Sequence, residues 1–588
     1  MNLKDACPND LKLVNIDDLK PITIIEASRL YSRGSTTGRT CNCRGNCAMK
    51  TCPYDLPDEI LMYIFKKFYN DELLYSLMDV NQRLNRILHD RIFTRHLCLL
   101  KYCRIDNSTI PLQDSILDRF CLKILPKIGH QIETLSLERT SIERVLRATN
   151  YPNLNNLVLC DIDFKLAESL FAEKNPLTHT FKNQITSLLT NFNKGNVLSP
   201  LGGVSPIIFR NILTIFTNLQ CLKFNLSASF LDASALHMAG ETAICSTLLE
   251  LHVTVANIED CLYILDGRFD QLRILYVTFY GIFPDFGSIE HKKKMLPNLR
   301  IFSLYCKRQI DDFDESIVPL LRRMLNLEEL DLNIVVQCYE KFISGDTLMK
   351  DIMIYMPQLY KLTFNICSII NHGDQAIFPL NEDIEKTFKS FSNNQIITCI
   401  DHFQEEGFSQ CHIYSYPYKL KVYNNITNNF LGGLFTSVTQ VSLYDERPFE
   451  HEFFRRIQKS FPFMKELTIN NRKAQNNKQL MKLNNDNQIM SIIEYRYLTR
   501  LNIINTHDDY VELFLFDTKI SLPNNLHLCA DYQSLKRVTY DFTRDITRNH
   551  SSKFAALYFS TSHKIDEHIK NCFPHTFIRC FSDFVLSK

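Results

Sequence analysis

Hydrophobic residues recur along most of this chain in a short frame of three. The second hydrophobic residue lies three positions after the first, and the third lies two positions after the second. The frames repeat mostly every 22 to 37 residues. They begin at Ile132, Leu154, Leu219, Leu248, Leu272, Leu299, Leu327, Leu359, Val438, Met464, Leu498 and Leu535. Each frame predicts a short strand with one buried side, because alternate strand residues point to opposite faces.

Patterns typical of helices lie between the frames. One apolar helical stripe is formed by Phe449, Phe453, Phe454 and Ile457, and another by Leu348, Met349, Ile352, Tyr355 and Met356. A strand followed by a helix cannot bury its own apolar side, whereas stacked copies bury a continuous core. The repeats therefore predict an α/β solenoid over residues 132–588, with the strands lining its inner, concave side.

The frames resemble leucine-rich repeats, which are about 20–29 residues long. Several carry the lead-in Asn-Leu, as at Asn153-Leu154 and Asn298-Leu299. The resemblance implies an irregular leucine-rich-repeat horseshoe. Gaps between the frames indicate degenerate units near residue 185 and over 379–433, and a long insertion is the alternative for 379–433. The aromatic stretch 410–418 is either core or an exposed binding loop, and core is favoured because aromatic side chains mostly serve packing. A doubly wound α/β domain remains the alternative fold, although its strands would be continuous apolar runs.

A pattern of three short helices precedes the repeats, within residues 54–100. Pro57 suits a first helical position, and the acidic residues that follow it suit the first turn of a helix. Asn70 or Asp71 is expected to cap the second helix, and Asp79 is expected to cap the third. Residues 101–131 are expected to form a helical linker to the repeats.

Residues 56–88 resemble the F-box, the module that joins a substrate receptor to the Skp-type adaptor of a cullin-RING ubiquitin ligase. The matching order is Leu-Pro-x-Glu-Ile-Leu, Ile-Phe, Glu-Leu-Leu, Val-Asn-x-Arg-Leu and Ile-Leu, although the family often has Trp where this chain has Leu84. The resemblance implies an adaptor-binding surface made from Leu56, Pro57, Glu59, Ile60, Leu61, Ile64, Phe65, Leu73, Leu74 and Val80.

The same resemblance implies a function. The chain would be a non-catalytic substrate-recognition subunit of a Skp–cullin–F-box ligase, with the adaptor and a cullin as partners and the repeats binding a protein target. An interaction scaffold that has an F-box-like module but no ligase role stays open as the alternative.

The expected target site lies on the concave side of the strands. In each frame it comprises the residue between the second and third hydrophobic positions and the residue directly after the third. These are Ser136, Glu138, Val158, Lys223, Asn225, His252, Tyr276, Thr278, Ser303, Tyr305, Asp331, Asn333, Thr363, Asn365, Ser442, Tyr444, Thr468, Asn470, Asn502, Thr539 and Asp541. This set is polar, nearly neutral and carries scattered tyrosines, which suits a protein target. We expect its centre at Tyr276, Tyr305 and Asp331, with loops or the end near 573–581 as the alternative.

Composition and charge narrow the classes of partner. A chain of 588 residues with 45% hydrophobic residues exceeds one compact core. Its 66 basic and 65 acidic residues leave a formal charge of +1, so we expect no nucleic-acid or membrane partner. The first twenty residues lack the apolar core of a signal peptide, and a cytoplasmic or nuclear location is expected. Most of the 20 cysteines then fit buried free thiols.

Little in the sequence suggests catalysis or a cofactor. A zinc site is conceivable at Cys41, Cys43, Cys47 and Cys52 in the loop-like segment 1–53. The paired Cys-x2-Cys spacing is missing there, so redox-sensitive thiols are favoured and no metal or cofactor is expected. The chain has neither a Gly-rich phosphate loop nor a catalytic Gly-x-Ser-x-Gly or His-Glu-x-x-His motif, and we expect no enzyme activity. His507 and Asp508, which follow a predicted strand, are interpreted as solvated surface.

Overall fold

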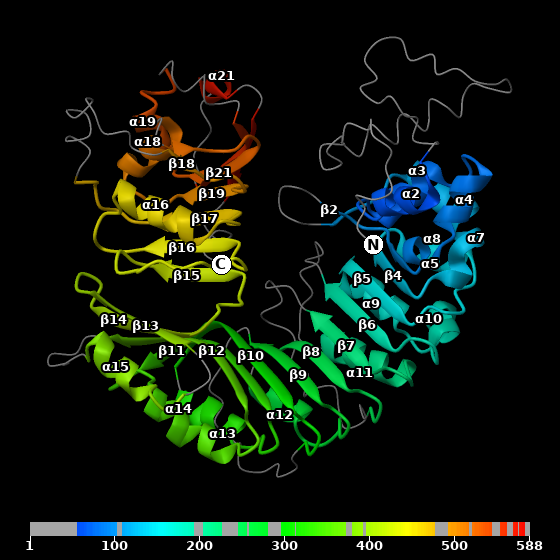
Figure 1. The fold of residues 1–588 in the computed structure, drawn as a ribbon, viewed down its shortest axis with the longest axis horizontal. Helices are drawn as coiled ribbons and strands as arrows, with labels where there is room; N and C mark the ends of the chain where they lie inside the picture. Colours follow the sequence, from blue (N-terminus) through cyan, green and yellow to red (C-terminus); the bar gives the residue numbers. More distant parts are fainter. Residues whose placement is uncertain are drawn as a thin grey trace, which may run out of the picture. The chain divides into compact units, whose positions relative to one another are not determined.

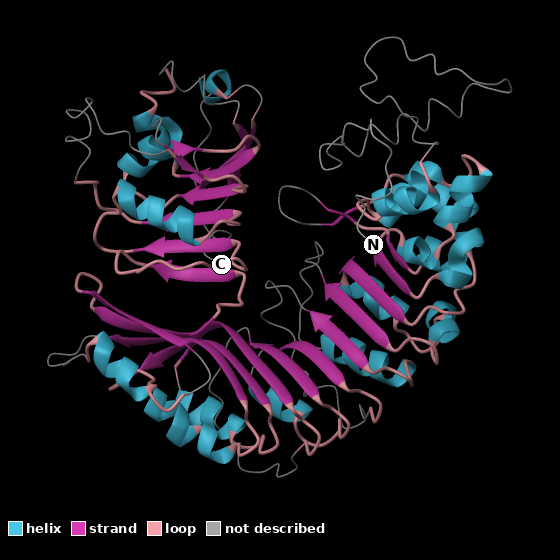
Figure 2. Ribbon diagram, in the orientation of Figure 1, coloured by secondary structure: helices cyan, strands magenta, loops and turns pink. Residues whose placement is uncertain are grey.

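The structure is a computed structural model and divides into two compact units. It describes residues 56–102, 109–192, 204–225, 245–255, 258–279, 296–311, 313–371, 379–391, 395–476, 492–516, 520–543, 553–560, 568–573 and 576–581. The first unit comprises residues 1–280 and 285–299, and the second comprises 281–284 and 300–588. Both are α/β units with mostly parallel sheets (Figures 1 and 2). The expected array over 132–588 therefore divides near residue 300.

The described part of the first unit begins with four short helices, α2 (Asp58–Phe65), α3 (Asn70–Leu77), α4 (Gln82–Leu88) and α5 (Arg91–Thr94). The predicted helix ends are wrong in detail. Helix α2 starts one residue after Pro57, and Asn70 lies inside α3, donating its side-chain amide to the carbonyl of His96. Asn81 caps α4 by accepting from the Leu84 N–H at 2.8 Å, whereas Asp79 has a φ of 68° and lies in the preceding turn.

A parallel sheet follows in the first unit. The strands of this sheet that belong to the first unit are β1 (His96–Cys98), β4 (Thr134–Glu138), β5 (Asn156–Ile162), β6 (Ser187–Phe192), β7 (Cys221–Asn225), β8 (Glu250–Val255) and β9 (Ile274–Phe279), in that order. Strand β6 is the repeat that looked degenerate near residue 185. Figure 1 shows helices α8 (Ile142–Ala148), α9 (Phe164–Leu170), α10 (Pro176–Phe181), α11 (Val204–Ile215) and α12 (Ile258–Ile264) along one face.

The expected linker is partly helical. A short antiparallel pair, β2 (Lys101–Tyr102) and β3 (Thr109–Ile110), is followed by α6 (Asp114–Arg119), a π-helix over 120–124 and α7 (Leu125–Ile128). Strand β1 comes before this linker yet pairs with β4, in register from His96 with Thr134. The sheet thus begins inside the segment 54–100 that the sequence assigned to the helical module.

The second unit opens with three long parallel strands, β10 (Ile301–Ile310), β11 (Glu329–Cys338) and β12 (Lys361–Asn371). Helices α13 (Val318–Leu321), α14 (Gly345–Asp351) and α15 (Asn381–Thr387) cover one face of them (Figure 1). The predicted stripe that ends in Tyr355 and Met356 is correct only in part. Helix α14 stops at Asp351, and Tyr355 is exposed, whereas Leu348, Ile352 and Met356 are buried.

Within residues 379–433, the part 395–416 forms no degenerate repeat, which corrects that prediction and fits the alternative of an insertion. Strands β13 (Gln395–Phe403) and β14 (Phe408–Tyr416) make an antiparallel hairpin, and β14 pairs antiparallel with β12. The interpretation of 410–418 as core is confirmed, since Cys411, Ile413, Tyr414 and Tyr418 are buried.

A second parallel sheet completes this unit. It contains β15 (Val422–Ile426), β16 (Gln440–Tyr444), β17 (Glu466–Asn470), β19 (Arg500–Ile503), β21 (Leu526–Ala530), β22 (Phe554–Ser560) and β23 (Phe577–Phe581). Helices α16 (His451–Ser460), α18 (Asp508–Phe516) and α19 (Tyr532–Val538) lie along one face (Figure 1). The frame at Leu535 falls within α19, so the strand predicted there is wrong. No helix in the described part of the chain is long and apolar enough to cross a membrane.

The frame leucines stack in register across the parallel strands. In the first unit Leu135, Leu157, Leu188, Leu222, Leu251 and Leu275 are successive partners, and all are at most 4% exposed. Burial of one such side chain contributes roughly 1.5–3 kcal/mol. The ladder of leucines fixes which strand face carries the helices and which carries polar residues.

An aromatic cluster joins the two sheets of the second unit. The Phe435 ring lies 4.9 Å from that of Phe461 and 5.3 Å from that of Tyr423, measured between centroids. Tyr414 at the end of β14 contacts the same ring at 6.2 Å. Gly433 approaches so closely, with a φ of +139°, that a Cβ there would lie 2.8 Å from the Phe435 ring.

Replacing Phe435 by Ala tests this cluster. We expect a loss of about 3–5 kcal/mol in unfolding free energy, because a large buried ring leaves a cavity among five aromatic neighbours. Amide hydrogen exchange over residues 408–426 should accelerate strongly. The matched control is Phe463→Ala, whose ring is 45% exposed and should change exchange little. Equal effects of the two variants would contradict a structural role for the cluster.

Candidate docking and target-binding surfaces

The outer side of α2 carries the residues that begin the F-box-like order. Pro57 and Glu59 are exposed, and Leu56 and Ile60 are half-buried. Pro57, Ile60 and Tyr63 follow one another at a spacing of three, so they share one side of the helix. Tyr63 is 53% exposed, and the sequence patterns did not select it. These four apolar side chains, Leu56, Pro57, Ile60 and Tyr63, are called the α2 patch below.

The ten predicted adaptor residues fall into two groups. Leu61, Ile64, Phe65, Leu73 and Leu74 are buried inside the helical module, where Phe65 packs edge-to-face on Phe93 at 6.2 Å. Leu56, Pro57, Glu59, Ile60 and Val80 reach the surface. The first group holds the module together, and only the second can meet a partner without rearrangement.

Arg83 fixes the position of Leu56 and Pro57. Its guanidinium donates to the carbonyl of Leu56 at 2.5 Å and to Asp58 at 2.7 Å, while Arg86 donates to the other Asp58 oxygen at 2.6 Å. The hydrogen bond from Arg83 holds the pKa of Asp58 below its usual value. Helix α4 thereby sets the start of α2, even though 25 residues separate Arg83 from Asp58 in the sequence.

The inner side of the module packs on its own chain. Tyr75 of α3 stacks on Phe120 at 6.2 Å, with the Arg119 guanidinium 5.2 Å from the Tyr75 ring. Arg119 also donates to the carbonyl of Met78, and Lys127 pairs with Asp79 at 2.5 Å. The helical segment 114–131 therefore covers this side.

The face of the strands opposite the helices is called the polar face. In the first unit its half-buried members include Lys223 of β7 and His252 of β8, and Tyr276 of β9 is 37% exposed. The His252 ring stacks on Tyr276 at 4.2 Å and donates from Nε2 to Glu250 at 2.5 Å. Burial lowers the pKa of His252 despite Glu250, so the imidazole is neutral at pH 7 and donates as a neutral ring.

In the second unit the polar face is tied together by hydrogen bonds between strands. The two carboxylate oxygens of Asp331 accept from Ser303 at 3.2 Å and Thr363 at 2.8 Å. Two residues further along the strands, Asn365 donates to Asn333 at 2.8 Å and accepts from His412 Nε2 at 2.5 Å. This face is a preorganised polar surface, because neighbouring strands fix each side chain.

The predicted target residues lie in both units. Tyr276 belongs to the first unit, whereas Tyr305 and Asp331 lie on adjacent strands of the second, and both are half-buried. Three members of the wider predicted face were placed wrongly. Glu138 is buried, and Thr539 and Asp541 lie at the end of α19, away from any strand.

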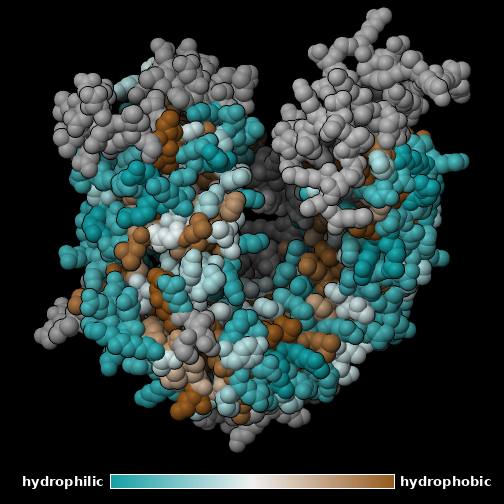
Figure 3. Space-filling view, in the orientation of Figure 1, coloured by the Kyte–Doolittle hydropathy of each residue, from teal (hydrophilic) through white to brown (hydrophobic). Residues whose placement is uncertain are grey.

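The structure does not describe the zinc site considered in the sequence analysis. Its four cysteines, Cys41, Cys43, Cys47 and Cys52, lie outside the described residues. Within the described ranges, no group of three or more His, Cys, Asp or Glu side chains is placed to hold a metal ion. Polar residues dominate the visible surface in Figure 3, and apolar residues form small scattered groups.

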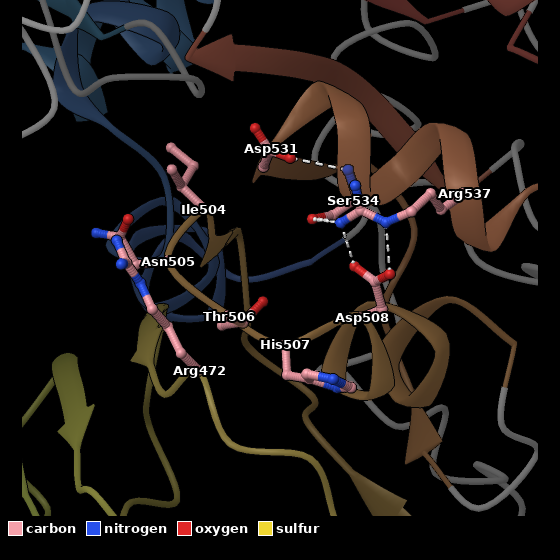
Figure 4. Close-up of a pocket in the computed structure, with 9 residues that line it drawn as sticks. All are labelled: Arg472, Ile504, Asn505, Thr506, His507, Asp508, Asp531, Ser534 and Arg537. Carbon is pink, nitrogen blue, oxygen red and sulfur yellow. Dashed lines mark hydrogen bonds and ion pairs between the residues drawn. The ribbon is translucent and has the colours of Figure 1, made fainter.

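A pocket that sequence reasoning missed lies in the second sheet of the second unit. It has a volume of about 470 Å³ and is lined by Arg472, Ile504, Asn505, Thr506, His507, Asp508, Asp531, Ser534 and Arg537 (Figure 4). Asp508 was interpreted as solvated surface, yet it begins α18 and pairs with Arg537. The sequence did carry a signal for this pocket, because polar residues directly follow several neighbouring strands.

The half-buried His412 gives the second unit a predictable pH dependence. Burial lowers its pKa to about 4 from an ordinary 6.5, so the unfolded chain takes up a proton that the folded unit does not. Stability contributed by the neutral ring is present above pH 6.5 and is lost as the pH falls toward 4, by about 2–3 kcal/mol. The difference in unfolding free energy between wild type and His412→Gln, measured by urea unfolding, should shrink by that amount as the pH falls from above 6.5 toward 4. His568→Gln, at an exposed histidine, is the control, and a difference that stays constant with pH would contradict the assignment.

Comparisons with known proteins name no family for this chain. No family model matches it, and no curated protein matches it. Among solved structures, the crystal structure of a Rad7 and Elc1 complex in yeast is similar at 16% sequence identity. That match covers 52% of this chain and 87% of the other, with a TM-score of 0.26.

Proposed function

We propose that this protein is a non-catalytic substrate-recognition subunit of a Skp–cullin–F-box ubiquitin ligase. Its leucine-rich-repeat-like sheets bind a protein target, and its helical module docks on the Skp-type adaptor. One observation carries the proposal. The F-box-like order falls on three successive helices, and its leading residues Leu56 and Pro57 are held at the surface by Arg83.

The α2 patch supplies the chemistry of docking. Apolar side chains that cluster at a surface mark interaction sites, and an apolar helix face suits a groove formed by partner helices. The exposed Glu59 adds a charged rim beside Pro57 and Ile60. An adaptor would bury this patch while the module's own leucines stay in its interior.

The polar face supplies the chemistry of target binding. Its fixed hydroxyl, amide and carboxylate groups offer directional hydrogen bonds, and Tyr276 and Tyr305 offer rigid amphipathic contacts. The chain's formal charge of +1 gives no general attraction to nucleic acid. A folded protein or an extended peptide is therefore the favoured target.

A scaffold without a ligase role is the second candidate, and a specific observation favours it. The inner side of the helical module is already covered by residues 114–131, through Tyr75, Phe120 and Lys127. A module that packs on its own chain can serve as a cap for the first sheet, because terminal repeats need one.

Co-purification separates the two candidates. The full chain carrying an affinity tag is isolated from cells, and the bound adaptor and cullin are quantified by mass spectrometry. A ligase receptor brings down both proteins in comparable amounts. A scaffold brings down the adaptor alone or neither protein, and that result would overturn the proposed ligase role.

Replacing Leu56 and Pro57 together by Ala tests docking. Central apolar anchors contribute about 2 kcal/mol or more each, so adaptor binding should weaken by roughly a thousandfold. Binding is measured by calorimetry with purified adaptor. Tyr69→Ala, at a side chain that is 76% exposed and outside the α2 patch, should bind normally. Wild-type affinity in the double variant would show that the docking site lies elsewhere.

Changes on the polar face test target capture. The variant combines Tyr276→Ala, Tyr305→Ala and Asp331→Asn, where the Asn oxygen keeps an acceptor for one of the two hydroxyls, Ser303 or Thr363, and its amide N–H can donate to the other hydroxyl oxygen. The recovery of proteins that co-purify with wild type should fall at least tenfold, whereas the recovery of the adaptor should not change. The control is Tyr497→Ala, which removes a tyrosine that is 51% exposed and precedes β19. Unchanged co-purification would place the target site on loops or at the C-terminal end.

A further inference from the structure

The pocket in the second sheet lies at the carboxyl ends of three parallel strands. Arg472 follows β17, residues 504–508 follow β19, and Asp531 follows β21. Ligands of parallel α/β sheets bind outside the carboxyl ends of the strands, where loops from neighbouring strands meet. The volume of about 470 Å³ suits a few side chains of a peptide.

The backbone that carries Arg472 is held rigidly. Asn471 is buried, donates its N–H to the carbonyl of Asn505 at 3.0 Å and accepts from the His507 N–H at 2.9 Å. Its side-chain oxygen also accepts from the Lys473 N–H at 2.9 Å. Both neighbours of Arg472 in the chain are thus fixed, which preorganises the wall from which the guanidinium projects.

Two of the charges that line the pocket, Asp508 and Arg537, already satisfy one another. Arg537 donates to both oxygens of Asp508, at 2.7 and 2.8 Å, and to the Ser534 hydroxyl at 3.0 Å (Figure 4). This pairing holds the pKa of Asp508 below its usual value and raises that of Arg537. Asp531 accepts from the Ser534 N–H at 2.8 Å through one oxygen.

Arg472 differs from these residues. Within the part of the chain that the structure describes, its guanidinium has neither a hydrogen-bond partner nor an ion-pair partner. Figure 4 shows Arg472 and Asn505 on the side of the view away from the Asp508–Arg537 pair, and both residues line the pocket. The pocket therefore presents the positive charge of Arg472 and the amide of Asn505 on a fixed wall, and the carboxylate of Asp531 is the other charged lining group outside the Asp508–Arg537 pair.

We propose that this pocket binds the carboxylate of an acidic peptide segment, with Arg472 pairing with the Asp or Glu side chain of the peptide. Asn505 donates a further hydrogen bond, and the second oxygen of Asp531 accepts a peptide N–H. The inference deepens the proposed function. It rests on that function only for the source of the peptide, which is a captured target.

The lining favours a carboxylate over a phosphoryl group. Two Arg and two Asp side chains line the pocket, so these four formal charges sum to zero. A phosphoryl group carries about −1.5 to −2 charges, and Asp531 and Asp508 would repel the second charge. A single negative charge is matched by Arg472 alone, and Arg pairs with carboxylates through two parallel hydrogen bonds.

Selection of phage-displayed random 12-residue peptides on the purified full chain tests the proposal. Clones that bind wild type but not Arg472→Glu should carry Asp or Glu at a common position, and the synthetic peptides should lose at least tenfold in affinity toward Arg472→Gln. The control Arg496→Gln, at an exposed arginine before β19, should bind these peptides as wild type does. Selection on Arg472→Glu should instead return Lys or Arg at that position, which a merely structural Arg472 would not produce.

Three outcomes would overturn the proposal. These are the absence of clones that depend on Arg472, Arg472-dependent clones without an acidic residue, and displacement of the peptides by 10 mM inorganic phosphate. The assay contains no adaptor, cullin or target, so its result is independent of ligase assembly. Loss of cullin co-purification with retained peptide selection would reject the ligase role alone.

Discussion

Stacking of the frame leucines in register is the interaction on which both units depend. Each strand contributes two or three apolar side chains to a ladder such as Leu222, Leu251 and Leu275, and the helices cover that ladder. A one-residue slip would turn every leucine to the other face, so the register is strongly specified. The polar face, its hydrogen bonds and the pocket at the strand ends all follow from this register.

The polar face shows how the same residues can stabilise a sheet and remain available for binding. Asp331 links three strands through Ser303 and Thr363, and the Asn333–Asn365–His412 row does the same two residues further along. Such groups lose little conformational entropy when a ligand arrives, because the neighbouring strands already hold them. A target meeting this face would exchange water for prealigned partners.

The junction within the second unit relies on contacts that are distant in sequence. The buried Asp401 of β13 accepts hydrogen bonds from Thr427 and Asn429, both at 2.7 Å, beyond the end of β15. Lys473 reaches back to Glu405 at 2.6 Å, and the aromatic cluster around Phe435 fills the space between β14 and α16. These contacts let an antiparallel hairpin end one parallel sheet and a second parallel sheet begin beside it.

The sequence by itself determined the local elements wherever apolar spacing was unambiguous. Every frame except the one at Leu535 gave a strand, the stripe at Phe453 and Ile457 gave α16, and the F-box-like order gave three helices. The frame at Leu535 failed because a spacing of three also fits a helix, and β21 was missed because it is buried on both sides and does not alternate.

Tertiary structure alone decided the division near residue 300, the hairpin at 395–416 and the burial of Leu61, Leu73 and Leu74 inside the helical module. It also brought Arg472, Asp508 and Arg537 into one pocket, although they come from three different repeats. The physical reason is that spacing along a chain sets which face a residue occupies, whereas pairing between distant strands sets which residues become neighbours.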